Sequence, residues 1–211
     1  MSQVWQRLGH WFRYLCGWLF ILTSAITLTV HAVWVYRVTL SNTDVLQQVG
    51  LTRAQMMHNY MQLLHYLNWP WVTQLRLPNF VDSVGALKHF ADVKQLLLLN
   101  NLVCLVTLPI VGWGLWWLWH EERLWQLLLP MQIALPLPPV VAALMAVNFD
   151  QFFITFHHLL FRNNDWLFDP RYDPIINALP ESFFLACFAL FFVLLEGWLI
   201  AGYLVSRRSL R

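Results

Sequence analysis

Charged residues are scarce in this chain of 211 residues, where Asp, Glu, Lys and Arg together make up only 11%. A soluble domain carries about 25% charged residues. Because 59% of the residues are hydrophobic, the composition favours a membrane protein. The formal net charge is +2 and the basic residues are scattered along the chain, so the sequence gives no support to a nucleic-acid partner.

Cysteine is also rare, with Cys16, Cys104 and Cys187 each inside an apolar run. There is no C-x-x-C pair, which leaves zinc ribbons and thioredoxin-like chemistry without support. The three residues are expected to be small buried hydrophobes. We expect neither a metal site nor a cofactor.

What the chain has in abundance is long apolar stretches. A membrane-spanning helix needs about 20 apolar residues, and four stretches qualify: roughly 14–36, 95–119, 124–147 and 183–205. Prolines interrupt the third, which predicts a kinked or broken helix there. The expected fold is all-α, a polytopic membrane helix bundle forming a single domain over residues 1–211.

Basic residues near the ends of the spans predict the orientation of the chain. Arg7 and Arg13 precede the first span, and Arg207, Arg208 and Arg211 follow the last. Both termini are therefore expected in the cytoplasm, which places the loops 37–94 and 148–182 on the outer side. A cleaved signal sequence is the alternative for the first span, but its apolar run continues through Tyr36.

The first outer loop contains a predicted short helix. Thr52-Arg53-Ala54-Gln55 is a capping-box pattern, and apolar residues follow at helical spacing up to Leu67. This amphipathic helix either lies in the headgroup region or packs on the protein's own outer loops.

Two histidine-bearing segments are the candidates for chemistry. His89 lies three residues before Asp92, so both share a helix face, and Lys88 pairs with Asp92 at a spacing of four. A carboxylate beside an imidazole can raise its basicity, as a general base requires. The second segment, in the other outer loop, is rich in polar and aromatic residues and includes His157, His158, Asn163, Asn164, Asp165, Trp166, Asp169 and Glu181.

One ionisable residue lies within a predicted span. Glu196 falls in the fourth span, where a charge is costly. We expect it to pair with a polar residue of the bundle such as Asn100, Asn101 or Gln132.

The order of these segments resembles the four-span lipoprotein intramolecular transacylase family. The matching residues are the run from Asn79 to Gly85, Lys88 to Lys94, Phe156-His157, Phe161, Asn163 to Trp166, Asp169-Pro170 and Pro180 to Phe184. The resemblance implies an enzyme of the bacterial cytoplasmic membrane with its active site facing outward. Its partner would be the diacylglyceryl-modified N-terminus of a lipoprotein, together with membrane lipid.

The implied reaction moves the sn-2 acyl chain onto the α-amine of the N-terminal cysteine and gives the lyso form. The resemblance carries the two functional histidines over to His89 and His157. We expect one to act as base and the other to polarise or protonate the ester. His89 oriented by Asp92 is our first choice for the base, and the reverse assignment stays open.

Several other residues of the two loops are candidates for supporting roles. Lys88, Asn164 or Trp166 could donate to the oxyanion, and Asp169 and Glu181 are orienting or substrate-binding candidates. Ser83 is an alternative as an acyl-enzyme nucleophile.

Two other classes of protein remain as alternatives. One is a non-enzymatic membrane protein that binds haem or metal through histidine. The other is a small transporter, although the spans show no internal repeat.

Overall fold

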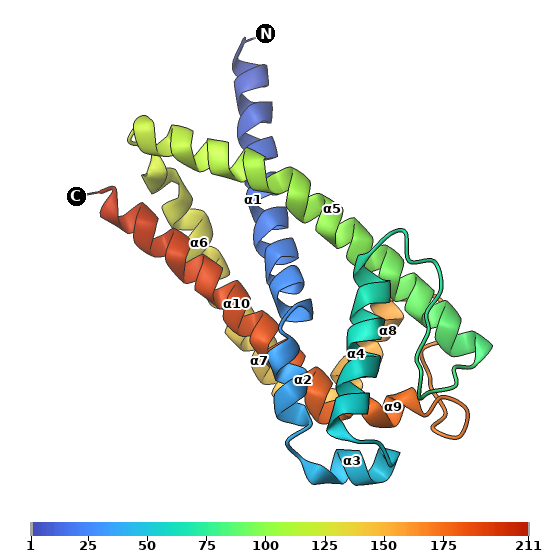
Figure 1. Cartoon of the computed structure of the whole chain (residues 1–211). Helices are drawn as coiled ribbons and strands as arrows, with labels where there is room; N and C mark the ends of the chain where they lie inside the picture. Colours follow the sequence, from blue (N-terminus) through green and yellow to red (C-terminus); the bar gives the residue numbers. More distant parts are fainter. Residues whose placement is uncertain (1, 211) are drawn as a thin grey trace. The chain divides into compact units, whose positions relative to one another are not determined.

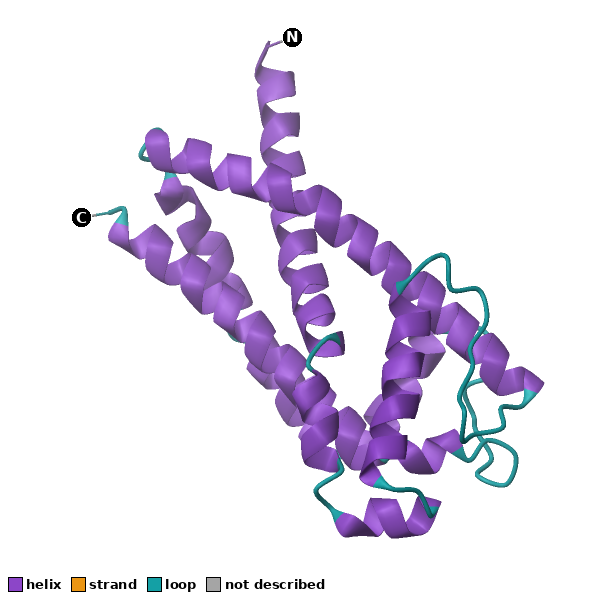
Figure 2. Cartoon of the chain, in the orientation of Figure 1, coloured by secondary structure: helices purple, strands orange, loops and turns teal. Residues whose placement is uncertain are grey.

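The computed structural model describes residues 2–210, with side chains described at 9, 11–42 and 44–210. Arg211 and the side chain of Arg7, two of the basic residues behind the predicted orientation, lie outside this part. The described residues form helices joined by loops, with no strand among them (Figure 2), which confirms the expected all-α class.

Ten α-helices and one 3₁₀ helix, η1, follow one another in the described residues (Figure 1). In chain order they are α1 (Ser2–Val30), α2 (Val33–Thr39), α3 (Thr43–Val49), α4 (Arg53–Asn68), α5 (Val84–His120), η1 (Leu124–Leu127), α6 (Leu128–Ala134), α7 (Leu137–Val147), α8 (Phe149–Leu160), α9 (Ile175–Ala178) and α10 (Glu181–Arg208).

Four segments of the described chain are long and apolar enough to cross a membrane, as the sequence predicts. They are Trp11–Val30, Val84–His120, Leu124–Val147 and Glu181–Arg208. The first ends at Val30 rather than near Tyr36, because the helix stops there and α2 begins at Val33. The third is divided between α6 and α7, which confirms the break expected from its prolines.

Helix α5 begins well before the predicted span at Gln95. Its 37 residues correspond to about 55 Å at 1.5 Å per residue, which exceeds the roughly 30 Å of a bilayer's hydrocarbon core. The first turns, residues 84–94, contain Lys88, His89, Asp92 and Lys94. We therefore treat residues 84–94 as a polar extension of α5 beyond its apolar span.

The chain divides into two compact units. Unit 1 comprises Met1–Leu28, Asn100–Ala146 and Ala189–Arg211, and unit 2 comprises Thr29–Leu99 and Val147–Phe188.

Unit 1 contains most of the apolar helix length. Its core joins Met131 and Ala134 of α6 to Leu199 of α10. These helices approach closely at Gly202, where an added Cβ would lie 2.9 Å from the Met131 Sδ atom. Small residues permit such close helix packing in membrane proteins.

Asn100 of α5, one of the partners expected for Glu196, bonds to helix α1. Asn100 of α5 donates to the Thr23 carbonyl oxygen at 3.3 Å and to Thr27 Oγ1 at 2.8 Å. Glu196 Oε2 is buried and has no hydrogen-bond partner in the described part of the chain. The Asn100 amide therefore bonds to α1 and not to Glu196, and pairing of Glu196 with Asn101 or Gln132 stays a prediction.

In unit 2, helix α4 packs on the protein itself. The predicted capping box is present, since Thr52 Oγ1 accepts from the Gln55 backbone N–H and Gln55 Oε1 accepts from the Thr52 N–H. Tyr60 of α4 is buried and stacks on Tyr36 at 4.1 Å between ring centroids. The second of the two alternatives for this helix is thus the one observed.

The turn after α4 is fastened to α5 by a buried lysine. The Lys94 ammonium donates to the Val72 carbonyl oxygen and lies 4.4 Å from the centroid of the Tyr66 ring. The residues between Trp69 and Ser83 therefore lead from α4 back to the start of α5. At that start, Ser83 Oγ caps the helix by accepting from the Ala86 backbone N–H at 3.1 Å.

Candidate active site

Unit 2 brings the two histidine-bearing segments together. His89 comes from the polar extension of α5 and His157 from the last turn of α8. Their ring centroids are 5.9 Å apart. The expectation that these two segments meet is confirmed.

Local structure decides which histidine of the pair His157-His158 faces inward. Asn148 caps α8 by accepting from the Gln151 backbone N–H, and the helix continues to Leu160. On this helix His157 faces His89, whereas His158 is exposed and touches the edge of the Trp166 ring. Successive helical residues point about 100° apart, so only one of the two can face α5.

The tautomer of His157 follows from its hydrogen bond. Its Nδ1 atom lies 2.8 Å from the Phe153 carbonyl oxygen one turn earlier. A carbonyl can only accept, so Nδ1 carries the proton and the neutral ring keeps its lone pair on Nε2. Trp166 stacks on the same ring at 4.8 Å and helps to hold its orientation. His157 thus presents a fixed, unprotonated Nε2.

His89 lies in an apolar enclosure. Phe161 and Phe168 meet its ring edge-on, at 4.8 and 5.6 Å between centroids, and the side chain is 7% exposed. Burial and, to a smaller extent, the nearby His157 lower the pKa of His89 to about 4, while the charges of Asp92 and Asp165 oppose the change. Burial also lowers the pKa of His157, against the opposing effect of its bond to Phe153. Both rings are therefore neutral at neutral pH.

The expected contact between Asp92 and His89 takes a different form. Within the described residues His89 Nδ1 is buried without a hydrogen-bond partner, and Asp92 Oδ2 accepts instead from Asn163 Nδ2 at 3.0 Å. Asp92 therefore does not orient His89 by a hydrogen bond at Nδ1. Its carboxylate acts on the ring only through its charge, which raises the His89 pKa.

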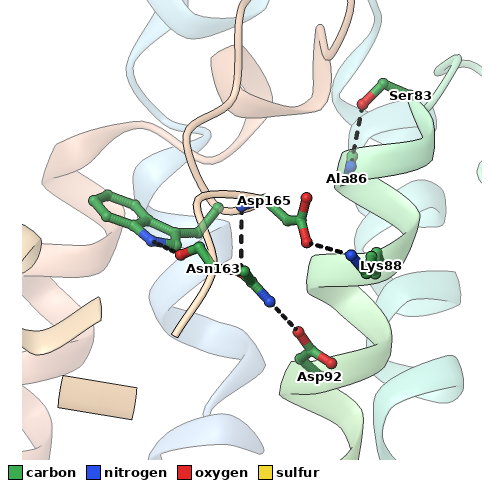
Figure 3. Close-up of polar contacts among 7 residues, drawn as sticks. Ser83, Ala86, Lys88, Asp92, Asn163 and Asp165 are labelled. Carbon is green, nitrogen blue, oxygen red and sulfur yellow. Dashed lines mark hydrogen bonds and ion pairs between the residues drawn. The ribbon is translucent and has the colours of Figure 1, made fainter. Parts of the chain in front are cut away.

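The turn from Asn163 to Trp166 is clamped to α5 at two points (Figure 3). One is the bond between Asn163 and Asp92, and the other is an ion pair of 3.1 Å between Lys88 Nζ and Asp165 Oδ2. Lys88 and Asp92 are four residues apart and so share a helix face. The expected Lys88–Asp92 pair is replaced by this double contact with the second loop.

Bonds within the turn connect this clamp to the imidazole. Asn163 Oδ1 accepts from the Asp165 backbone N–H at 3.2 Å, and Trp166 Nε1 donates to the Asn163 carbonyl oxygen at 3.0 Å. Trp166 in turn stacks on His157. These contacts together fix the orientation of the His157 ring relative to α5. The Trp166 N–H is already engaged and is not available to an oxyanion.

The remaining predicted residues are exposed or engaged in other contacts. Asn164 is exposed, Glu181 is exposed in the first turn of α10, and Asp169 pairs with Arg171 at 2.6 Å. Hydrogen bonds from Arg171 lower the pKa of Asp169 to about 2. Ser83 serves as the cap of α5. None of these contacts involves a histidine ring.

Sequence reasoning missed Asn163 and Asp165 as positioning residues. It named both within the loop but selected their neighbours Asn164 and Trp166. The signal that could have found them is the i, i+4 spacing of Lys88 and Asp92, which offers a cation and an anion to one partner segment.

In the described residues no group of three or more His, Cys, Asp or Glu side chains is placed to hold a metal ion.

A pair of carboxyl groups lies beside the start of α5. Asp173 is buried and accepts from the Ser83 backbone N–H at 2.9 Å. Burial and, to a smaller extent, the charge of Asp173 raise the pKa of Asp82 to about 6. Asp82 Oδ1 is buried and has no hydrogen-bond partner among the residues that the structure describes.

Asp82→Asn is therefore expected to stabilise the protein at pH 8 but not at pH 3.5. A raised pKa means that the folded state holds the proton more tightly, so stability is greatest below the unfolded pKa and is lost as pH rises through about 6. The gain at pH 8 should be on the order of 1 kcal/mol, because the group is partly exposed and screened. Thermal unfolding in detergent at both pH values measures it. Glu121→Gln, at an exposed turn, is the control, and an equal loss of stability at both pH values would contradict the prediction.

Comparison with known proteins identifies relatives of this chain. The family model for the lipoprotein intramolecular transacylase Lit matches residues 12–184. No match is found among curated proteins.

Solved structures of the membrane-integral lipoprotein intramolecular transacylase Lit from Bacillus cereus are similar in fold. One has 29% sequence identity and a TM-score of 0.83, and the match covers 96% of this chain and 97% of that chain. Two structures of histidine variants, one with arginine and one with alanine, match at TM-scores of 0.75 with 27% and 28% identity, over 100% of this chain and 97% of theirs. With the four candidate spans, these matches make the chain a multi-pass membrane protein, and it belongs to the lipoprotein intramolecular transacylase family.

Proposed function

We propose that this protein moves the sn-2 acyl chain of a lipoprotein's diacylglyceryl group onto the α-amine of the same N-terminal cysteine, giving the lyso form. The family supports lipoprotein transacylation in general. The observation that carries the finer proposal is the pair of neutral imidazoles, 5.9 Å apart between ring centroids, with Nε2 of His157 free of its proton.

The chemistry needs one proton moved and one oxyanion stabilised. The amine nitrogen attacks the ester carbonyl carbon, a nitrogen–carbon bond forms, and the bond from that carbon to the sn-2 oxygen breaks. The proton lost by nitrogen ends on the glycerol oxygen. Neutral imidazoles suit this transfer, because one nitrogen accepts a proton while the other nitrogen of a ring donates.

The hydrogen bonds favour His157 as the base, the reverse of our first choice from the sequence. Its tautomer is fixed by Phe153, which leaves Nε2 ready to accept the amine proton. His89, buried among aromatic rings, would donate to the ester oxygen and stabilise the developing charge, which is worth more in such a low-dielectric site. The rings would return the proton to the glycerol oxygen as the ester bond breaks.

No covalent intermediate on the enzyme is needed. Amine and ester belong to one modified cysteine, so holding them together lowers much of the barrier, with effective molarities of about 10⁵ M or more. We further propose that both termini are cytoplasmic and that the site faces outward, from the basic residues beside the spans.

Expression in a bacterium that makes only diacyl lipoproteins tests the proposal. Mass spectrometry of lipoprotein N-termini should show a free glycerol hydroxyl together with an N-acylated cysteine. The total number of acyl chains should stay unchanged, because the transfer is intramolecular. If the protein is present in the membrane and the termini keep a free amine, the proposal fails. A gain of a third chain would instead indicate an external acyl donor and also contradict it.

A further inference from the structure

Unit 1 contains a cavity that the proposed reaction does not use. Its volume is about 290 Å³, and residues of α1, α5, η1, α6 and α10 line it. Every lining residue lies within unit 1, whereas both imidazoles belong to unit 2. The lining is almost wholly apolar, with Trp18, Leu118, Met131 and Trp198 among its members.

Missing side chains create this space. An ideal Cβ added at Gly17 or Gly114 would meet no atom within 4 Å. Gly114 is nevertheless buried, so its missing side chain faces the interior of the cavity and not a packed neighbour. Trp18, Leu115 and Trp198, which line the cavity, are themselves exposed, so the space opens to the surroundings and its apolar walls lack the contacts that close packing supplies. An occupant that restores those contacts would stabilise the unit.

One end of the cavity is polar and positively charged. Arg13, Tyr14 and Gln126 line it, and the Tyr14 hydroxyl donates to the Gln126 carbonyl oxygen at 3.3 Å. The Arg13 guanidinium lies 4.6 Å from the centroid of the Trp117 ring, and Arg123 lies 5.7 Å from the same ring. Two guanidinium groups therefore gather beside one aromatic ring, and the Arg13 side of this cluster lines the cavity.

We propose that this cavity binds an acyl chain of an anionic phospholipid, with the lipid phosphate held by Arg13 and Arg123. The helices that line the cavity belong to the four candidate membrane spans. Membrane phospholipid therefore surrounds these helices and is the apolar ligand available to the cavity. A guanidinium binds phosphate through paired hydrogen bonds. The site lies at the predicted cytoplasmic end of the spans, where basic residues meet anionic headgroups.

Filling the cavity tests where the lipid binds. The protein and its Gly114→Leu variant are purified in mild detergent, and the phospholipid that stays bound is extracted and quantified. Wild type should retain phosphatidylglycerol in stoichiometric amounts and gain thermal stability when more is added, since a ligand of the folded state raises the unfolding temperature. Gly114→Leu should retain almost none and should not respond to added lipid.

Gly112→Leu is the matched control for this substitution. It makes the same change two residues away on α5, but Gly112 is exposed and does not line the cavity. This variant should retain lipid as wild type does. Equal lipid retention in both variants, or no bound lipid in wild type, would overturn the proposal.

A second comparison tests the headgroup. Phosphatidylcholine with the same acyl chains replaces phosphatidylglycerol in the titration of wild type and of the double variant Arg13→Gln with Arg123→Gln. Wild type should prefer phosphatidylglycerol roughly tenfold, because the choline ammonium of phosphatidylcholine cancels the net negative charge that the two guanidinium groups attract. The double variant should lose that preference while still binding the chain. Equal binding of both lipids by wild type would remove the anionic headgroup from the proposal.

Discussion

His157→Ala is expected to lower the rate of acyl transfer by roughly 10²–10⁴-fold, the usual contribution of a general base. The substitution removes the Nε2 lone pair that the bond between Nδ1 and the Phe153 carbonyl leaves available. His89→Ala should cause a loss of the same order, because it removes the donor facing that ring. The measurement is the fraction of N-acylated lyso termini formed over time by purified enzyme.

His158→Ala is the matched control for these two variants. It removes a histidine from the next position of α8, but one that is exposed and meets the Trp166 ring at its edge. Its activity should stay close to wild type. A rate for His158→Ala as low as that of His157→Ala, at equal amounts of folded protein, would contradict the roles assigned to His157 and His89.

Asn163→Ala is expected to reduce activity by about 10²-fold, an effect typical of misplacing a catalytic group by about 1 Å. Asn163 connects Asp92 of α5 to the turn whose Trp166 stacks on His157. Loss of its bond to the carboxylate should also cost roughly 1.5–3 kcal/mol of stability. The loss should fall mainly on the chemical step, which single-turnover kinetics separate from binding.

Asn164→Ala provides the comparison, since the sequence points to Asn164 as readily as to Asn163. This neighbour is exposed, so its stability should change by less than about 0.5 kcal/mol. The pairing itself can be measured by adding Asp92→Ala. If Asn163 and Asp92 act together, the double variant should be no worse than the more affected single variant. Fully additive losses, or an Asn164→Ala defect as large as that of Asn163→Ala, would contradict the clamp.

Features that depend on local pattern could be predicted from the sequence. Apolar length gave the four spans, and prolines gave the break between α6 and α7. The pattern from Thr52 to Gln55 predicted the capping box of α4. Each of these depends on residues close together in the chain, which a reading of hydrophobicity and helix signals can assess.

Features that depend on long-range partners could not be predicted in the same way. A helical spacing of three placed His89 and Asp92 on one face, but it could not show that Asn163, 71 residues away, takes the carboxylate. The same limit applies to Asn100, which bonds to Thr27 of α1, 73 residues away.

By itself the sequence determined that this is a four-span helical protein with two histidine segments, because hydrophobic length and residue order are carried by the chain directly. The sidedness of the membrane stays a prediction from basic residues. Only the tertiary structure decided which of His157 and His158 meets His89, and which ring nitrogen of His157 carries the proton. Those choices follow from helix phase and from distances between segments far apart in sequence. A spacing pattern cannot encode them, since each polar group bonds to whichever partner the fold places within about 3 Å.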